Sequence, residues 1–159
     1  MDRLNHILHN PVFRAHLKRT ARKEKGRKFC RHDLPHALDV ARIAYILVLE
    51  GRMDISKDVV YAAGLLHDIG KWVQIEKGTP HHLSSAELAE ELLDAAGFSP
   101  AEKETIIGAI LSHRTKGLPE GTFDAVLYIA DKRSRRCYDC KTKALCDWEA
   151  EKKNSVILV

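Results

Sequence analysis

Apolar residues recur at spacings of three and four along most of the chain, which is the period of an amphipathic helix. The clearest run begins at the helix-start residues Asp33 and Pro35 and ends at Gly51. Its apolar positions are Ala37, Leu38, Ala41, Ala44, Tyr45, Val48 and Leu49. No stretch alternates apolar and polar residues for long, so the pattern predicts helices and no sheet.

Two further helices flank this run in the first half of the chain. Asn10 and Pro11 form an N-cap and first-turn pair, and the helix that they open is expected to end near Gly26. Ser56 caps a helix whose apolar residues continue to His67. The first half therefore contains three predicted helices.

The second half contains two Ser-x-x-Glu capping boxes, in which the serine and the glutamate satisfy each other's backbone amides. They predict helix starts at Ser84, with Glu87, and at Ser99, with Glu102. The first of these helices is expected to end at residue 97 and the second to run toward residue 113. After a break at residues 117–119, a last long helix places Asp131 near its middle.

The composition agrees with this pattern. A chain of 159 residues that is 45% apolar and 30% charged suits one globular domain that buries roughly two thirds of its unfolded surface. We therefore predict an all-α fold, a single compact bundle of about five to seven helices over residues 1–159. A cysteine-containing segment occupies about residues 132–153 of that domain.

The chain shows no targeting or membrane segment by sequence criteria. Residues 1–19 carry scattered charges and no apolar stretch of the kind that a secretory signal requires. The longest apolar stretch covers residues 43–49, whereas about 20 residues are needed to span a bilayer. We expect a cytoplasmic location, where the four cysteines are reduced.

Positive charge is concentrated in two stretches, although the net charge is only +4. Residues 14–31 contain nine arginines and lysines and one glutamate, and a second basic group lies at residues 132–143. Such groups either attract phosphates, on a small substrate or a nucleic acid, or form solvated helix faces.

The strongest chemical motif is a His67-Asp68 pair at a helix end. Adjacent residues on a regular helix point about 100° apart, so both can bind one ion only where the turn opens. Gly70 supplies that opening, and Lys71 follows it.

The string at residues 65–71 resembles the central part of the signature of the HD-domain phosphohydrolase superfamily. The full signature is a histidine, then a His-Asp pair, then a distant aspartate. His36 resembles the first ligand and Asp131 the last. Four motif residues in this order are more specific than a lone His-Asp pair. The resemblance implies an HD-domain helical bundle in which His36, His67, Asp68 and Asp131 bind a divalent metal ion.

Superfamily members with two ions take further ligands between the His-Asp pair and the last aspartate. In this interval the chain has His81, His82 and His113. The segment around His113 is similar to that of bacterial diadenosine polyphosphate hydrolases. His81 suits the pattern better than His82, because Ser85 and Ala86 follow it by four and five positions. We interpret the remaining histidines outside the motif as caps or surface residues: His6, His9, His16 and His32.

Imidazole and carboxylate ligands suit Mn, Fe, Co, Ni or Zn, and ligand type does not choose among them. A bound ion lowers the pKa of its water from 15.7 to about 7 and polarises a phosphoryl oxygen. The resemblance implies that Asp68 bridges two ions, while Lys71 and Arg114 neutralise charge on the phosphate. We therefore predict hydrolysis of a phosphoester or phosphoanhydride of a nucleotide or similar small substrate, by metal-activated water.

An alternative is a metal-containing binding module that grips RNA or another polyanion through residues 14–31 and 132–143. The ligand set disfavours this alternative, because a structural ion is normally saturated by protein atoms and this set leaves positions for water. The sequence does not predict the oligomeric state or the role of the apolar tail at residues 156–159.

Cys137 and Cys140 form a CxxC motif, and Cys146 follows six residues later. Cys30 lies six residues before His36, and Cys137 lies six residues after Asp131. If His36 and Asp131 bind one ion they are close together, and six residues are enough for the four thiols to converge. Three interpretations remain open: a structural zinc, a [4Fe-4S] cluster, or reduced cysteines without metal.

Overall fold

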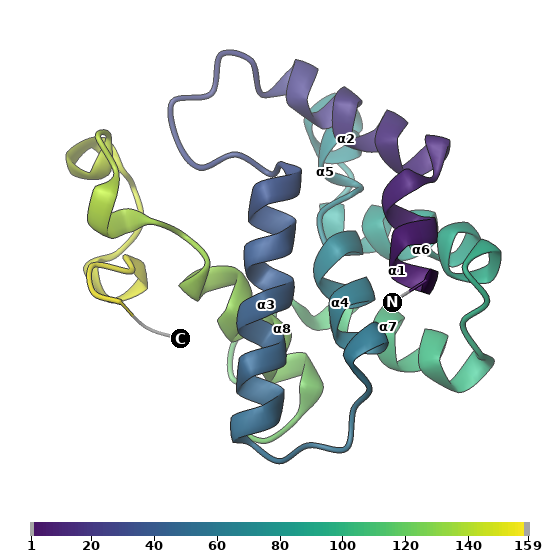
Figure 1. Ribbon diagram of the computed structural model, residues 1–159. Helices are drawn as coiled ribbons and strands as arrows, with labels where there is room; N and C mark the ends of the chain where they lie inside the picture. The colour runs from purple at the N-terminus through teal and green to yellow at the C-terminus, as the bar shows by residue number, and fades with distance from the viewer. Residues whose placement is uncertain (1, 158–159) are drawn as a thin grey trace.

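The computed structural model describes residues 2–157, which form eight α-helices, three short 3-10 helices and no strand (Figure 1). The all-α class predicted from the hydrophobic pattern is confirmed. The α-helices are α1 (Asp2–His9), α2 (Pro11–Lys23), α3 (Leu34–Glu50), α4 (Lys57–Leu66), α5 (Lys71–Lys77), α6 (His81–Ala95), α7 (Pro100–Ser112) and α8 (Phe123–Arg133). The 3-10 helices are η1 (Cys137–Asp139), η2 (Lys143–Leu145) and η3 (Ala150–Lys152).

Helices α3 and α4 form the centre of the bundle, with α8 against α3 and α7 against both α4 and α8 (Figure 1). Gly64 permits the contact between α3 and α4. A Cβ atom at Gly64 would lie 2.6 Å from the Cα atom of Ala41, closer than real side chains come. The two helix backbones are therefore in direct contact, which brings the start of α3 close to the end of α4.

Four predicted helix starts are confirmed by side chains that accept hydrogen bonds from first-turn N–H groups. These N-caps are Asn10 for α2, Asp33 for α3, Ser56 for α4 and Ser99 for α7. At α7 the full capping box forms, because the Glu102 carboxylate also accepts from the Ser99 N–H. Helix α2 ends at Lys23, slightly before the predicted end near Gly26.

The predicted capping box at Ser84 and Glu87 is wrong. Helix α6 begins three residues earlier, at His81, with Pro80 as its N-cap. Ser84 lies in the second turn, where it is buried, and its hydroxyl donates to the Pro80 carbonyl, whereas Glu87 is exposed. Ser84 and Ser85 lie on the buried face of α6, where a larger side chain would collide with the turn that follows α4.

Gly70 lies in that turn, and its role is close packing. Its N–H donates to the Ser85 hydroxyl at 2.9 Å, and a Cβ atom at this position would lie 2.5 Å from the Ser85 nitrogen. The turn is consequently clamped between α4 and α6. This contact holds Asp68 and His81 on adjoining elements.

Helix α8 is shorter than predicted. It ends at Arg133, so Asp131 lies in its last turn and not near its middle. Two short helices, α1 and α5, had no sequence prediction; each depends on packing against the longer helices around it. Asp131 is thereby placed where α8 meets the start of α3.

Residues 134–157 form a lobe of turns and 3-10 helices beside the loop between α2 and α3 (Figure 1). Val156 and Ile157 of the apolar tail are exposed, and residues 158 and 159 lie outside the described part of the chain. Among the described helices, none has the length and apolarity required to cross a membrane.

Candidate metal centre

Three helix ends bring the four motif residues together. His36 lies in the first turn of α3, His67 and Asp68 follow α4, and Asp131 lies in the last turn of α8. The His67 Nε2 atom lies 3.1 Å from Asp68 Oδ2, and His36 Nε2 lies 3.4 Å from Asp131 Oδ1 and 3.5 Å from Asp68 Oδ2. One ligand atom from each of the four residues falls within 4.8 Å of the others.

A second group shares Asp68 with the first. His81, the first residue of α6, places Nε2 3.1 Å from Asp68 Oδ1, and His113, which caps the end of α7, places Nε2 3.8 Å from the same oxygen. Asp68 therefore presents one oxygen to each group. His82 contributes no ligand atom to either group among the described residues.

Hydrogen bonds to backbone carbonyls orient two of the imidazoles. His67 Nδ1 lies 2.8 Å from the Gly64 carbonyl, and His113 Nδ1 lies 2.6 Å from the Ile110 carbonyl. Because a carbonyl only accepts, both Nδ1 atoms carry the proton, so in the neutral imidazole Nε2 presents a lone pair to the site. This is the usual arrangement of metal-binding histidines.

Ser134 performs the same task for His36. Its hydroxyl donates to the Asp131 carbonyl at 2.8 Å and lies 3.1 Å from His36 Nδ1. Since the hydroxyl proton is already used, the serine oxygen accepts from His36 Nδ1–H. The lone pair of His36 is then on Nε2, which faces the carboxylates.

Several imidazole nitrogens at this site lack a hydrogen-bond donor, which is the arrangement expected where a cation binds. The Nε2 atoms of His36 and His67 are buried and make no well-aligned hydrogen bond, although carboxylate oxygens lie 3.1–3.5 Å away. The Nε2 atoms of His81 and His113 lie only 3.1 Å apart, and His113 presents its lone pair there. A divalent cation satisfies such lone pairs together with the carboxylates, so the donor set fits a metal with nitrogen and oxygen ligands.

The charge states also suit metal binding. Burial raises the pKa of Asp68, but without a bound cation the charge of the neighbouring histidines, His67 first, outweighs burial and holds this pKa well below its usual range. Burial lowers the pKa of His67, but Asp68 outweighs burial and raises it, so a bound cation takes the place of the His67 proton. Burial also raises the pKa of Asp131, but without a bound cation the contact with His36 and then the charge of Arg135 outweigh burial and hold this pKa well below its usual range. Burial lowers the pKa of His113 to about 3, so its imidazole is neutral at physiological pH. Ionised carboxylates and a neutral imidazole are the forms that bind metals.

The two groups open into a cavity of about 310 Å³ whose lining is strongly basic. Lys71 is partly buried there, its ammonium 3.3 Å from both Gln74 Oε1 and His81 Nδ1, and burial lowers its pKa. Arg114 lines the same cavity but is exposed. The further basic lining residues are Arg27, Lys116, Lys132, Arg135 and Lys152.

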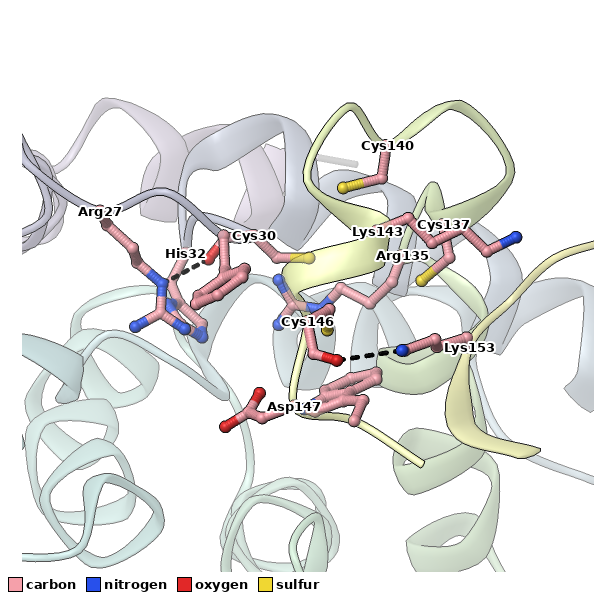
Figure 2. A pocket seen from close by; sticks show the side chains of 12 residues that line it. Arg27, Cys30, His32, Arg135, Cys137, Cys140, Lys143, Cys146, Asp147 and Lys153 are labelled. Carbon is pink, nitrogen blue, oxygen red and sulfur yellow. Dashed lines mark hydrogen bonds between the residues drawn. The ribbon is translucent and has the colours of Figure 1, made fainter. Parts of the chain in front are cut away.

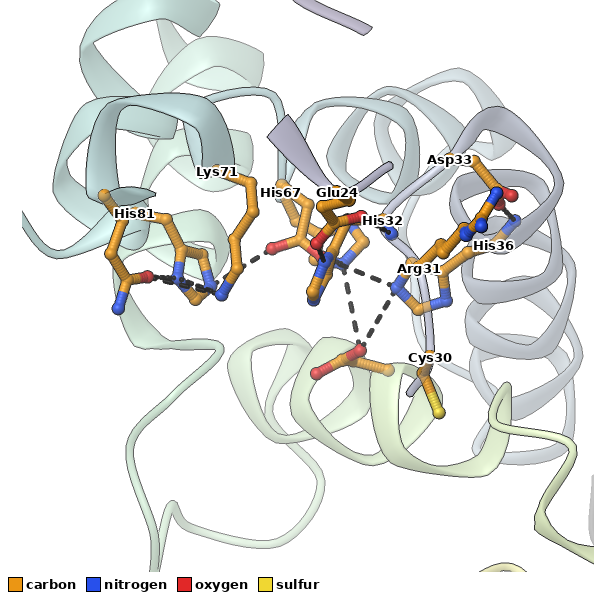
Figure 3. A network of polar contacts seen from close by, with 12 residues as sticks. Glu24, Cys30, Arg31, His32, Asp33, His36, His67, Lys71 and His81 are labelled. Atoms are coloured by element: carbon orange, nitrogen blue, oxygen red, sulfur yellow. Dashed lines mark hydrogen bonds and ion pairs between the residues drawn. The ribbon is translucent and has the colours of Figure 1, made fainter. Parts of the chain in front are cut away.

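His32 was wrongly interpreted as a surface or cap residue. Its side chain is 8% exposed, with Nε2 3.9 Å from Asp68 Oδ2 and Nδ1 hydrogen-bonded to Glu24 (Figure 3). The Glu24 side chain is only 2% exposed, although it lies in the basic stretch. The available signal was a single acidic residue among nine cations, which is unusual unless it has a buried partner.

The other three histidines outside the motif differ from one another. His6 and His9 are exposed, as expected. His16 is partly buried, stacks on Trp72 and accepts a hydrogen bond of 3.1 Å from the indole N–H. It serves the packing of α2 on α5 and lies outside the candidate centre.

Comparison with known proteins identifies relatives of the whole chain and of its helical core. An uncharacterised protein of Clostridium beijerinckii is 46% identical over 154 residues, which cover 97% of both chains. The ribonuclease Y of Mycoplasma mycoides is 34% identical over 101 residues, but the matched part is only 18% of that protein. YueE of Bacillus subtilis, provisionally assigned as a phosphohydrolase, is 36% identical over 104 residues and 58% of its length. No solved structure matches the chain.

The family profile of the HD domain matches residues 34–136, which is more than half of the chain. The matched region begins at the helix that carries His36 and ends just after the helix that carries Asp131. HD domains bind divalent metals, in agreement with the His and Asp cluster described above. The chain belongs to the HD-domain family.

Proposed function

We propose that this protein is a metal-dependent phosphohydrolase that cleaves a phosphoester or phosphoanhydride bond of a nucleotide or a similar small phosphorylated compound. One observation carries the proposal: two buried His and Asp groups share Asp68 beside a cavity lined by basic side chains. The relationship to YueE supports phosphohydrolase activity in general.

The residues that would hold metal follow from the two groups. His36, His67, Asp68 and Asp131 would hold one divalent ion, and Asp68, His81 and His113 would hold a second. When bound, such an ion supplies Lewis acidity and lowers the pKa of its water, so that hydroxide is available at neutral pH. Mn, Fe, Co, Ni and Zn all suit these ligands.

The protein's own side chains have separate tasks in this proposal. Asp68, with one oxygen toward each group, accepts a hydrogen bond from the attacking water and orients it. Lys71 and Arg114 face the cavity and offset the negative charge of the phosphate as the bond breaks. Gln74 positions Lys71 and His81, since its Oε1 atom contacts both.

The arrangement of charge favours a small phosphate over the alternative of a polyanion-binding module. Within the two basic stretches, Arg27, Lys132 and Arg135 line the candidate centre. Others are paired on the surface, such as Arg19 and Lys23 with Glu76 and Arg136 with Asp39. Three basic residues of these stretches are therefore directed at the cavity, and at least three more are paired with surface carboxylates. The ribonuclease Y relatives make RNA a substrate to be tested.

The decisive experiment compares Asp68→Ala with the wild type on p-nitrophenyl phosphate, nucleoside monophosphates and polyphosphates, and a short RNA, each with added manganese. We expect the wild type to hydrolyse a small phosphate and Asp68→Ala to lose this activity while its helical circular dichroism is unchanged. Asp54→Ala is a matched control, because Asp54 is exposed and outside the centre.

The other outcomes are also informative. Retained hydrolysis in Asp68→Ala would remove Asp68 from the mechanism and contradict the proposal. RNA binding that falls steeply with salt, without hydrolysis of any substrate, would support the binding module.

A further inference from the structure

All four cysteines line one cavity of about 260 Å³ next to the candidate centre (Figure 2). Cys30 comes from the loop between α2 and α3, whereas Cys137, Cys140 and Cys146 come from the C-terminal lobe. None of them forms a disulfide. Figure 2 shows their sulfur atoms around a shared space. Residues more than 100 positions apart therefore present thiols to the same volume.

The C-terminal lobe has little apolar material with which to dock. Among residues 134–157, only Ser134, Arg135, Cys137 and Asn154 are buried, and none of them is a large apolar side chain. Polar contacts tie the lobe down: the Thr142 hydroxyl donates to the Lys28 carbonyl at 3.1 Å, and the Asn154 amide donates to the Arg133 carbonyl at 2.6 Å. A segment of this length without a core needs a further cross-link to stay ordered, and thiolate–metal bonds are such a link.

The sulfur spacing distinguishes between kinds of centre. In the described chain, no three of the four sulfurs lie within 4.8 Å of one another; the groups that meet this limit consist of His and Asp. A tetrahedral zinc with bonds of about 2.3 Å holds its sulfurs about 3.8 Å apart. In a [4Fe-4S] cluster each thiolate binds a different iron, so the sulfurs are separated by the width of the cluster. The cysteines are therefore not arranged as a tetrahedral zinc site, and the more widely separated ligands of the cluster are compatible with their arrangement.

The lining of the cavity is complementary to such a cluster. Four thiolates around a [4Fe-4S]²⁺ core carry a net charge of about −2. The cavity is lined by four basic side chains and by the carboxylate of Asp147. These basic residues are Arg27, Arg135, Lys143 and Lys153.

Arg135 provides an independent indication of a missing partner. The residue is 7% exposed, and its Nε atom is buried without a hydrogen-bond partner. Its two terminal nitrogens are occupied, one by Asp131 Oδ1 and one by the Arg31 carbonyl, each at 3.2 Å. A thiolate or sulfide sulfur in the cavity would accept the Nε–H of Arg135.

We propose that Cys30, Cys137, Cys140 and Cys146 bind a [4Fe-4S] cluster that pins the C-terminal lobe to the loop between α2 and α3. The cluster is a structural link, and its assembly does not depend on hydrolytic activity. Because Arg135 contacts both the cysteine cavity and Asp131, the cluster also steadies one side of the candidate metal centre.

The test is the content of iron and acid-labile sulfide in the full-length protein purified without air. We expect about four sulfides per chain and about four irons beyond any iron at the His and Asp centre. Sulfide is the diagnostic quantity, since nitrogen and oxygen ligands do not retain it. Zinc that is bound without sulfide would overturn the cluster, and an absence of metal on the cysteines would overturn the site itself.

Variants then assign the ligands. Cys30→Ser and Cys140→Ser should each lose sulfide and visible absorption, with trypsin cleaving residues 136–157 faster than in the wild type. Ser155→Ala is the control, because Ser155 is an exposed residue of the same lobe. Should a cysteine variant fail to fold, oxidative removal of the cluster from the wild type replaces it. Unchanged sulfide in both variants, or unchanged proteolysis after removal, would overturn the proposal whatever the hydrolase assays show.

Discussion

At the scale of single residues, Ser134 shows how much the candidate centre depends on side chains that bind no metal themselves. Its hydroxyl donates to the Asp131 carbonyl and accepts from His36 Nδ1. One serine thus sets the tautomer of a histidine 98 residues away in sequence and ties it to the helix that carries Asp131. Groups of this kind are part of a metal site, because they hold its ligands in the binding form.

Replacing Ser134 with alanine should weaken metal binding about 10-fold to 100-fold, the usual cost of losing a group that orients a ligand. Without the hydroxyl, His36 loses the hydrogen bond that fixes its tautomer and ring orientation and that makes Nε2 a stronger ligand. Titration of the metal-free protein with Mn²⁺, followed by calorimetry, measures the change. Equal affinities in wild type and Ser134→Ala would show that His36 is oriented by other contacts.

At the scale of elements, glycines determine how closely the helices approach. Gly64 allows direct contact between the backbones of α3 and α4, and Gly70 allows the turn after α4 to meet α6. These contacts place the start of α3, the end of α4 and the start of α6 around Asp68. The candidate centre is built at helix ends, where the chain can change direction and present adjacent residues to one point.

Gly64→Ala should destabilise the protein by about 1–3 kcal/mol, because the added methyl collides with the backbone of Ala41 and not with a flexible side chain. Urea unfolding followed by circular dichroism measures this difference. Gly108 in α7 is the matched control, since a Cβ atom there meets nothing within 4 Å. Gly108→Ala should stabilise by up to about 1 kcal/mol through helix propensity. The same unfolding midpoint for both variants would contradict the close packing of α3 and α4.

At the scale of the whole molecule, the candidate centre joins elements from both halves of the chain. Its ligands lie on α3, after α4, at the start of α6, at the end of α7 and on α8. Two ionised carboxylates are buried among them, which is costly without a cation. Metal binding and global stability should therefore be linked.

Removal of metal with EDTA should lower the melting temperature, and Mn²⁺ should restore it. An ion at about 100 times its dissociation constant adds about 2.7 kcal/mol. For a domain of this size this free energy corresponds to roughly 5–10 °C. Differential scanning calorimetry measures the shift, and Asp68→Ala should show little response to EDTA. If the melting temperature of the wild type did not depend on metal, the prediction that metal binding at the His and Asp groups stabilises the fold would be wrong.

The helices themselves were largely predictable, because their signals are local. The caps at Asn10, Asp33, Ser56 and Ser99 each accept a hydrogen bond from a residue two or three positions later, so a short window of sequence contains both partners. The Ser84 prediction failed for the opposite reason. Pro80 starts the helix earlier, and the burial of Ser84 depends on a turn that lies more than ten residues away in sequence.

The candidate ligands divide in the same way. The order of histidines and aspartates along the chain was enough to name His36, His67, Asp68 and Asp131, which the structure brings within 4.8 Å. His32 and Glu24 were missed, because their burial arises only when the loop before α3 folds over the end of α4.

The sequence by itself determined the all-helical class, most helix starts and the residues that define the HD domain, because each is set by neighbouring residues or by a fixed order along the chain. Only the tertiary structure decided which oxygen of Asp68 faces each group, which histidine nitrogen carries the lone pair, and how far apart the cysteine sulfurs lie. These properties depend on distances between segments far apart in sequence. Such distances are set by how closely the helices and the C-terminal lobe pack, and no local pattern records them.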